Sequence, residues 1–376
     1  SISRGAPWVF AESIKNKIMC SPGSILKLVD KSGKFVAWGF YDHNCNIAFR
    51  VLTLKERDFP GNLWLRHKIE EAILLRKSLQ ETVTTGYRMI NGEGDGIPGM
   101  VCDLYGKTAV FKLDGDGANG FYNTVNIAEF LGKKLQLSCV YQRFRNKENN
   151  PGTLLYGVLP VEPLILKENG LLFEVDIIKG QKTGFFFDQR ENREKIGSFC
   201  QGKSVLNLFS YTGGFSVYAG QAGASMVTSV DIASMAIATA NKNWELNNLI
   251  MDKHKGLVAD TFSFLEKAGK MEKTWDIVIV DPPAFAHSKQ SVVRASRSYI
   301  NLVNSACKVT EKKGLLAVSS CSSHLTAENF VAICQEGIAR ARRRGRILWI
   351  NGLGIDHPGP LALPEFRYLK FIILQV

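Results

Sequence analysis

The feature that most constrains the fold is an alternation of strand-sized apolar runs with helix-sized stretches in residues 183–376. The apolar runs lie at residues 204–209, 226–230, 256–258, 276–280 and 315–319. A stretch of helical length follows each run before the next strand-sized run begins. This alternation predicts an α/β domain with a parallel sheet and helices on both of its faces.

Two segments of different texture precede this domain. Residues 1–70 alternate apolar and polar residues between turn signals, which predicts a small β module. Residues 71–182 combine short strands with helical stretches, which predicts a compact α+β domain. We therefore expect three domains, with boundaries at 1–70, 71–182 and 183–376.

A glycine-rich run in the second segment, Asn-Gly-Glu-Gly-Asp-Gly at residues 91–96, resembles a phosphate-binding loop only superficially. It has no lysine, and its two carboxylates would repel a phosphate. We interpret this run as a hairpin turn.

In parallel α/β sheets, ligands bind beyond the carboxyl ends of the strands. The segment 207–216 follows the first strand and contains Phe209, Ser210, Gly213 and Gly214. The paired glycines allow the backbone to approach a ligand closely. The segment is not GxGxxG, so the dinucleotide fingerprint is absent.

Two aspartates end the next two strands. Asp231 is suited to accept hydrogen bonds from ribose hydroxyls, and Asp260 from an adenine amino group. Each is equally suited to cap the helix that follows it. Together with the glycine segment they favour S-adenosylmethionine as the ligand.

The fourth strand ends in Asp281-Pro282-Pro283. Two prolines restrict the backbone, so the aspartate side chain and the nearby carbonyls keep fixed directions. A methyltransferase needs such rigidity to orient a planar base for in-line methyl transfer. This motif therefore favours a methyltransferase over a dehydrogenase.

The fifth strand ends in Ser320-Cys321-Ser322. Adjacent strands lie ~5 Å apart, so Cys321 is expected to share a pocket with Asp281. A thiolate that attacks carbon 6 of cytosine makes carbon 5 nucleophilic enough to accept a methyl group. A buried cysteine at the end of a core strand is the alternative, and methylation of a ring or exocyclic nitrogen needs no thiol.

Composition restricts the partners. The net charge of +12 favours a polyanion such as RNA. The eight cysteines form no CxxC pair, so we expect neither a zinc site nor a disulfide framework. This pattern of cysteines favours a protein of a reducing compartment. No apolar run approaches the ~20 residues of a membrane span, and the start lacks a signal-peptide pattern. We expect a cytoplasmic protein with no metal and no membrane partner.

Three segments carry a resemblance to a known family: residues 206–215, Asp281-Pro282-Pro283 and Ser320-Cys321-Ser322. They resemble the bacterial 23S ribosomal RNA cytosine-C5 methyltransferases that carry an N-terminal PUA domain. Further segments are similar to that family, at residues 5–10, 30–41, 88–99, 182–190, 356–358 and 368–370. Ala6 and the very basic run at 340–346 depart from its pattern, which puts the particular nucleotide in doubt more than the reaction.

The resemblance implies a PUA RNA-binding domain, a central α+β domain and a Rossmann-like catalytic domain that ends in an antiparallel strand. It implies that Cys321 is the nucleophile and that Asp281 orients the target base and assists proton transfer. The implied cofactor is S-adenosylmethionine, and the residues implied to bind it are Phe209, Ser210, Gly213, Gly214, Asp231, Asp260, Asp281, Pro282 and Gln189.

An RNA-modifying enzyme must hold its target base with aromatic and basic groups. The candidates for substrate contacts are Phe185, Arg190, Arg297, Tyr299 and Lys370. For each of them, core packing or a solvated surface is the competing interpretation. Two other functions stay open, a guanine or adenine nitrogen methyltransferase and a non-catalytic RNA-binding assembly factor. The oligomeric state is open as well, and a homodimer is compatible with the sequence.

Overall fold

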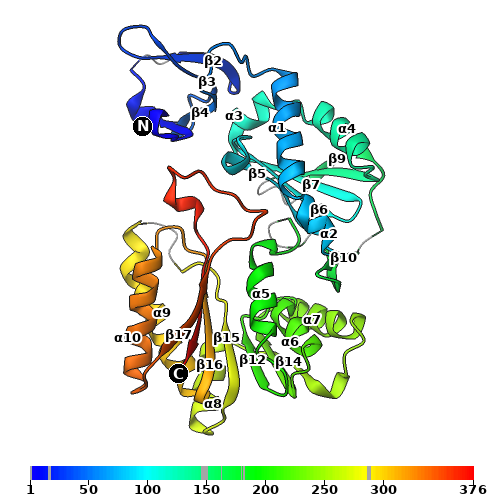
Figure 1. Ribbon diagram of the computed structural model, residues 1–376, viewed down its shortest axis with the longest axis vertical. Coiled ribbons are helices and arrows are strands. Elements are labelled where there is room, and N and C mark those ends of the chain that lie inside the picture. The colour runs from blue at the N-terminus through cyan, green and yellow to red at the C-terminus, as the bar shows by residue number, and fades with distance from the viewer. Residues whose placement is uncertain are drawn as a thin grey trace. The chain divides into compact units, whose positions relative to one another are not determined.

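The computed structural model describes residues 2–15, 18–144, 151–161, 163–178, 180, 183–285 and 289–376 (Figure 1). Lys182, the first residue of one segment in the resemblance, lies outside these ranges. The chain divides into two compact units. Unit 1 comprises Ser1–Gly170, Val175–Phe187 and Ile355–Phe366, and unit 2 comprises Leu171–Glu174, Asp188–Gly354 and Arg367–Val376. The sequence pattern does not indicate that residues 355–366 belong with unit 1. The division into three domains stays a prediction.

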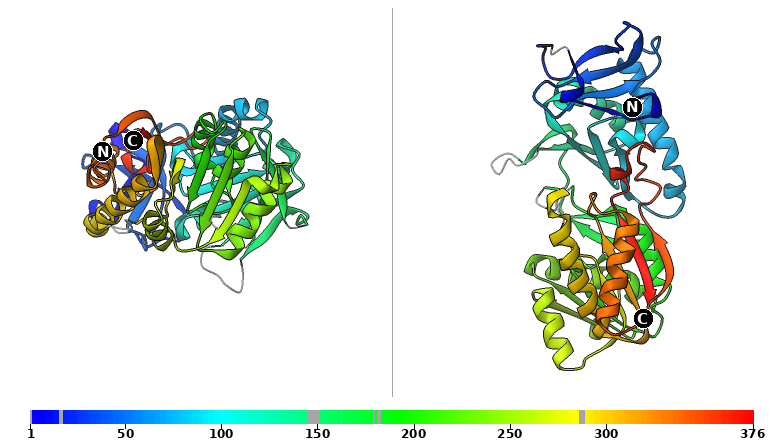
Figure 2. Two further views of the ribbon diagram at one scale, coloured as in Figure 1. Left: turned by 90° about the horizontal axis from the view of Figure 1, so that it is seen from below. Right: turned by 90° about the vertical axis from the view of Figure 1, so that its left-hand side faces the viewer.

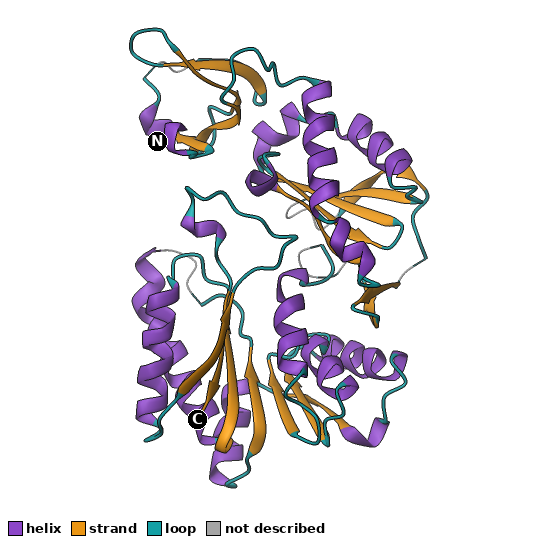
Figure 3. Cartoon of the chain, viewed as in Figure 1, coloured by secondary structure: helices purple, strands orange, loops and turns teal. Residues whose placement is uncertain are grey.

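The N-terminal part of unit 1 is the predicted β module (Figure 3). Its antiparallel sheet has the order β1 (Trp8–Phe10), β4 (Ile47–Thr53), β3 (Phe35–Tyr41) and β2 (Ser24–Val29). Short 3-10 turns lie at Ile2–Arg4 and Ala11–Ser13. The side chains of Ala37, Tyr41, Ala48 and Phe49 form its small core.

The rest of unit 1 contains the predicted α+β arrangement. One sheet has the order β5 (Gly86–Asn91), β6 (Met100–Tyr105), β7 (Thr108–Leu113), β8 (Cys139–Arg143) and β9 (Gly152–Gly157). The helices are α1 (Asn62–Leu75), α2 (Lys77–Glu81), α3 (Gly115–Phe121) and α4 (Thr124–Lys134). Farther along the chain, β10 (Leu164–Glu168) and β11 (Leu171–Val175) form a two-stranded sheet.

The glycine-rich run joins two antiparallel strands, as its interpretation as a hairpin turn predicts. A 3-10 turn at Gly92–Asp95 connects β5 to β6. Both carboxylates of the run are used internally. Glu93 accepts hydrogen bonds from Arg50 at 2.5 Å and from Trp8 Nε1 at 2.8 Å, and Asp95 binds the Arg76 guanidinium at 2.5 and 2.8 Å. The carboxylates therefore stabilise unit 1.

We expect Asp95→Ala to lower the unfolding free energy of unit 1 by about 3 kcal/mol, because it leaves a buried guanidinium without its carboxylate. The Arg76 side chain is 0% exposed and that of Asp95 is 3% exposed. The matched control is Glu71→Ala, which breaks an exposed ion pair with Lys68 and should cost less than about 1 kcal/mol. Urea denaturation of both variants measures the difference, and equal losses would contradict this assignment.

Unit 2 contains the parallel sheet that the alternation predicts. Its order is β14 (His254–Val258), β13 (Met226–Asp231), β12 (Ser204–Leu208), β15 (Trp275–Val280), β16 (Thr310–Ser320), β18 (Lys370–Gln375) and β17 (Arg346–Asn351). The pairs from β14 to β16 are parallel, and β18 is antiparallel to β16 and β17. The strand order reverses between β12 and β15, which is where sheets of this kind bind ligands.

Helices cover both faces of this sheet (Figure 2). They are α5 (Arg190–Gly197), α6 (Gly214–Gln221), α7 (Ser234–Leu246), α8 (Thr261–Lys270), α9 (Val292–Lys308) and α10 (Ala327–Arg340). Shorter 3-10 turns lie at Phe187–Gln189, Met251–Lys253, Lys289–Ser291 and Pro364–Phe366.

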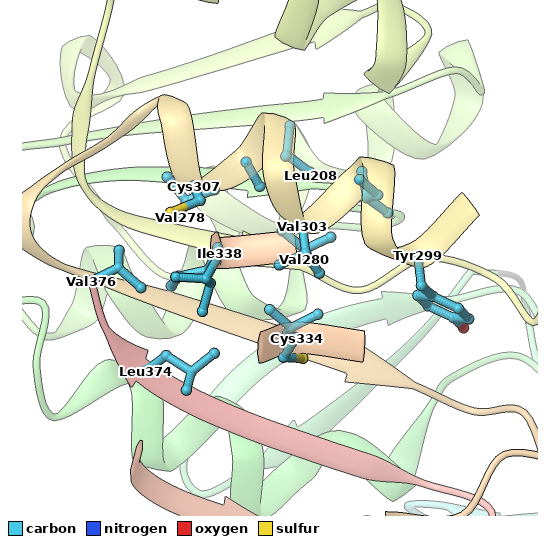
Figure 4. Packing of buried hydrophobic residues seen from close by; sticks show 14 of the residues in the cluster. Leu208, Val278, Val280, Tyr299, Val303, Cys307, Cys334, Ile338, Leu374 and Val376 are labelled. Carbon is cyan, nitrogen blue, oxygen red and sulfur yellow. The ribbon is translucent and has the colours of Figure 1, made fainter. Parts of the chain in front are cut away.

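Alternate residues of each strand enter opposite cores, because strand side chains point to the two faces in turn. On β15, Val278 and Val280 pack with α8, α9 and α10, whereas Ile277 and Ile279 pack with α5, α6 and α7. Figure 4 shows the first of these cores, including Val280. Two packed faces hold the strand ends rigidly, which is what a catalytic site requires. None of the helices in the described ranges is long and apolar enough to cross a bilayer.

Candidate active site

The loop after β12 has an unusual backbone. Phe209, Tyr211 and Gly213 have φ values of 57°, 46° and 78°, all in the left-handed region. Residues other than glycine avoid this region, and such strain is concentrated at functional sites. The Phe209 ring also packs edge-on against Phe262 at 6.4 Å.

The two glycines of this loop lie against neighbouring elements. A Cβ on Gly213 would lie 2.8 Å from the Ala240 Cβ, and a Cβ on Gly214 would lie 3.0 Å from the Arg193 Cδ. Gly213 also caps α6 in a left-handed conformation. A side chain at Gly213 would displace Ala240, whereas one at Gly214 would press on the Arg193 side chain. The close approach of both glycines to a ligand stays a prediction.

Polar atoms around the loop leave hydrogen-bonding capacity for a ligand. The buried Ser210 Oγ and Asn207 Oδ1 have no hydrogen-bond partner among the described residues. Asp231 accepts backbone N–H groups of Tyr211 and Ala233, both at 2.9 Å, and a carboxylate has about four acceptor positions. This set of atoms fits a ligand that carries hydroxyl and amino groups.

Asp260 caps a helix, as one of its two interpretations predicts. Its Oδ1 accepts the Ser263 N–H at 2.9 Å at the start of α8. The residue is exposed, so the cap does not prevent a ligand contact. Its role toward an adenine stays a prediction.

Asp281 lies in a hydrogen-bonded cluster at the end of β15. Gln189 Nε2 donates to Asp281 Oδ1 and to Ser319 Oγ, both at 2.9 Å. Asn192 Nδ2 in turn donates to Gln189 Oε1 at 2.6 Å and fixes which way this amide points. Burial raises the pKa of Asp281 to about 6, and the nearby carboxylate of Asp188 adds to the rise.

Sequence reasoning missed four members of this cluster: Asp188, Asn192, Ser319 and Tyr368. The Tyr368 hydroxyl donates to Asp188 Oδ2 at 2.7 Å. Asn192 was detectable, because it follows Gln189 by three residues and so lies on the same helical face. The contact between Tyr368 and Asp188 carries no local signal, since 180 residues separate them.

Cys321 directly follows β16 and is partly exposed. Lys370 lies on the adjacent strand β18, paired with Ser320. Its Nζ donates to the carbonyl oxygens of Ser322 at 2.6 Å and Tyr368 at 2.7 Å, and the residue is only 5% exposed. Burial lowers the pKa of Lys370 to about 8, and negative charge on Cys321 opposes this lowering. The ammonium and the thiol are therefore electrostatically coupled.

The other candidates for substrate contacts differ in exposure. Arg297 is exposed on α9. Tyr299 is 0% exposed, and burial raises the pKa of its phenol to about 12. Arg190 is 2% exposed and pairs with Glu191 at 2.8 Å. Phe185 is 4% exposed and packs on Phe187 within unit 1. Packing or an ion pair thus accounts for the last three in this structure, and the RNA contacts stay predictions.

Pro282 lies at the end of β15 beside Asp281.

Two family models match the chain. One, described as an S-adenosylmethionine-dependent methyltransferase, matches residues 129–319. The other, described as a PUA-like domain, matches residues 1–54. The first match includes the loop after β12 and Asp281, and ends at Ser319.

Similar proteins cover the whole chain. The ribosomal RNA large subunit methyltransferase I of Shewanella amazonensis is 34% identical over 385 residues, which are 100% of this chain and 96% of that protein. The ribosomal RNA large subunit methyltransferase of Deinococcus radiodurans is 34% identical over 389 residues, with 100% and 94% covered. A solved structure of a protein assigned as a methyltransferase, in complex with SAH, has a TM-score of 0.88 at 26% identity and covers 100% of this chain and 97% of that one.

Proposed function

The chain belongs to the S-adenosylmethionine-dependent methyltransferases that carry an N-terminal PUA-like domain, and on this premise we propose that it forms 5-methylcytosine in 23S ribosomal RNA. Relatives with the same architecture are named as methyltransferases of large-subunit ribosomal RNA, which supports the substrate. The choice of base is supported by the position of Cys321, which directly follows Ser320, the strand partner of Lys370, at the same end of the sheet as Asp281.

The residues around the loop after β12 would hold the cofactor. Asp231 would accept the ribose hydroxyls, Asp260 would lie toward the adenine, and Ser210 with the Gly213-Gly214 backbone would approach the methionine part. S-adenosylmethionine supplies an electrophilic methyl group on a sulfonium sulfur. Gln189 would orient Asp281 toward this end of the site, because one amide group bridges Asp281 and Ser319.

The chain's own groups account for the covalent chemistry. The Cys321 thiolate forms an Sγ–C6 bond with cytosine, and the electron pair that this addition places on carbon 5 takes up the methyl group. A base then removes the proton from carbon 5, and the Sγ–C6 bond breaks as the ring double bond re-forms. Asp281 is suited to orient the base and to receive this proton, since its pKa of about 6 leaves it ionised near neutral pH.

The proposal is tested by single-turnover methylation of 23S ribosomal RNA transcript with labelled S-adenosylmethionine, followed by nucleoside analysis. We expect 5-methylcytosine as the labelled product. A methylated purine would replace the proposal with a nitrogen methyltransferase. Binding of RNA without any methyl transfer would favour an assembly factor.

Gly213→Ala is expected to weaken S-adenosylmethionine binding by at least about tenfold, because the new Cβ must move Ala240 or the loop. The matched control is Gly202→Ala. Gly202 has a φ of 70°, but no atom lies within 4 Å of its Cβ position. Both variants carry the strain of a left-handed alanine, about 1 kcal/mol. Calorimetry should show lost affinity only for the first, and equal affinities would place the cofactor elsewhere.

Lys370→Met is expected to raise the pH midpoint of Cys321 alkylation by about one unit, because it removes the cation that favours the thiolate. Iodoacetamide modification followed by mass spectrometry measures this without RNA or cofactor. Tyr299 on α9, which also interacts electrostatically with this thiol, is unchanged. Lys370→Arg keeps the charge and should restore the wild-type midpoint. An unchanged profile in Lys370→Met would show that Lys370 does not stabilise the thiolate.

A further inference from the structure

Two turns at the amino-terminal end of the unit 2 sheet carry six exposed basic side chains. The residues between α9 and the early part of β16 contribute Lys308, Lys312 and Lys313. The turn between α10 and β17 contributes Arg342, Arg344 and Arg346, the last of them at the first position of β17. We call these six residues the basic turn cluster.

A seventh basic residue, Arg343, joins the two turns. Its guanidinium donates to the carbonyl oxygens of Cys307 and Glu311, both at 2.6 Å, and to that of Thr310. Because one side chain on the second turn binds three backbone groups of the first, the two turns that carry the six exposed residues lie side by side. Arg343 has an internal role and is not counted in the cluster.

The charge of this surface is not neutralised. No ion pair joins any of the six side chains to a carboxylate in the part of the chain that the structure describes. Arg340, one turn earlier, is instead paired with Glu336 at 2.8 Å. Glu311, the acidic residue next to Lys312 in the chain, accepts a hydrogen bond from the Thr274 hydroxyl. Unpaired cations on a shared surface sum to a positive potential that attracts polyanions.

Helix capping explains only part of this arrangement. Cations in the last turn of a helix interact favourably with its dipole, and Lys308 occupies that position on α9. The other five members lie beyond the ends of α9 and α10, where the dipole effect has faded. Arg343 already binds carbonyls at the end of α9. The remaining five charges therefore need another explanation.

We propose that the basic turn cluster binds backbone phosphates of the substrate RNA at a distance from the target base. This inference rests on the proposed function and specifies the kind of RNA that it requires. The cluster lies at one end of β16 and Cys321 follows the other end. Because β16 bulges between Thr310 and Leu315, which pair with Trp275 and Ile277, the rise along the strand separates them by roughly 25 Å. Only an RNA long enough to span this distance reaches both. Phosphates of an RNA helix meet the requirement, since helical RNA is recognised largely through its backbone and shape.

The test compares wild type with Lys312→Gln/Arg344→Gln/Arg346→Gln, which removes three charges drawn from both turns. The matched control is Lys253→Gln/Lys255→Gln/Lys267→Gln, which removes three lysines elsewhere in unit 2. Binding of 23S ribosomal RNA transcript is measured over a series of salt concentrations. A short single-stranded RNA, which cannot span the two ends of β16, serves as the second probe.

For the cluster variant we expect the slope of log affinity against log salt to fall in magnitude by about two to three with the transcript. Affinity at moderate salt should fall by about tenfold or more. The short RNA should bind all three proteins alike, and the thermal midpoint should stay unchanged. A slope that matches the control variant would overturn the proposal. So would cluster-dependent binding to vesicles of phosphatidylglycerol without an effect on RNA, which would assign the surface to a membrane.

The two proposals fail in distinguishable ways. If wild type yields no 5-methylcytosine while the cluster variant still loses salt-dependent affinity for the transcript, the choice of reaction fails and the phosphate-binding surface stands. If 5-methylcytosine forms and the slope is unchanged, the reaction stands and the surface does not bind RNA.

Discussion

Cys321→Ala is expected to reduce methyl transfer to ribosomal RNA by at least about a thousandfold, because addition of the thiolate to carbon 6 is the step that makes carbon 5 nucleophilic. Binding of S-adenosylmethionine should be unchanged, since the residues proposed to bind it lie after β12, β13, β14 and β15 and at Gln189, and do not include Cys321. Rapid-quench assays with saturating RNA measure the chemical step, and calorimetry measures cofactor affinity.

The matched control is Cys45→Ala, which removes another partly exposed thiol, in unit 1. It should keep full activity. If Cys321→Ala also keeps full activity, the cysteine is a packing residue and the product is not a carbon-methylated cytosine.

Asp281→Asn is expected to lower the rate of methyl transfer by about a hundredfold or more and to raise the stability of unit 2. The variant keeps the shape of the side chain and a carbonyl that can accept from Gln189, but it loses the charge. The pKa of Asp281 is raised from 3.8 to about 6, so the ionised form is unfavourable in the folded protein. Removing that charge should stabilise the protein near neutral pH by on the order of 2 kcal/mol.

The sign of the pH dependence follows from the same shift. Between about pH 4 and pH 6 the folded protein binds a proton that the unfolded chain has released. The stability contributed by Asp281 is therefore greatest at low pH and falls as the pH rises through this window. Activity should change in the opposite direction and decrease below about pH 6, where the carboxylate is protonated.

Asp276 provides the matched control, because it is the second residue of the strand that Asp281 follows. Its pKa is lowered by hydrogen bonds from Ser204 and by Lys203, although burial opposes the shift. Asp276→Asn should therefore destabilise unit 2 and leave the rate of methyl transfer unchanged. Denaturation and single-turnover assays of the two variants should give opposite signs in stability, and a loss of stability in both would show that Asp281 has a structural role only.

The sequence alone was sufficient to predict the strands of unit 2 and the residues at their ends. Parallel strands are buried on both faces, so each of them is a short apolar run, and the polar residue that follows it stands out. Asp231, Asp260, Asp281 and Cys321 were found in this way. The hairpin at residues 91–96 was predicted because its charges argued against a phosphate site.

Contacts between distant parts of the chain could not be predicted. The coupling of Lys370 to Cys321 depends on the pairing of β18 with β16, which no local pattern specifies. The position of residues 355–366 in unit 1 depends on two hydrogen bonds to Asp356. The Arg76 guanidinium donates to its carbonyl oxygen, and the backbone N–H of Arg88 donates to its carboxylate. Aromatic and arginine residues were ambiguous for a different reason, since Tyr299 and Arg190 are of types that occur both in cores and at RNA interfaces.

RNA that contains 5-fluorocytidine tests whether a covalent bond forms between Cys321 and carbon 6 of cytosine. Fluorine at carbon 5 leaves no proton to remove after methylation, so the enzyme cannot be eliminated. We predict a denaturation-resistant complex of wild-type protein, RNA and labelled methyl group, with the modification mapped to Cys321 and absent from Cys321→Ala. Methyl transfer to the same RNA with no trapped complex, or a complex that persists in Cys321→Ala, would contradict the account.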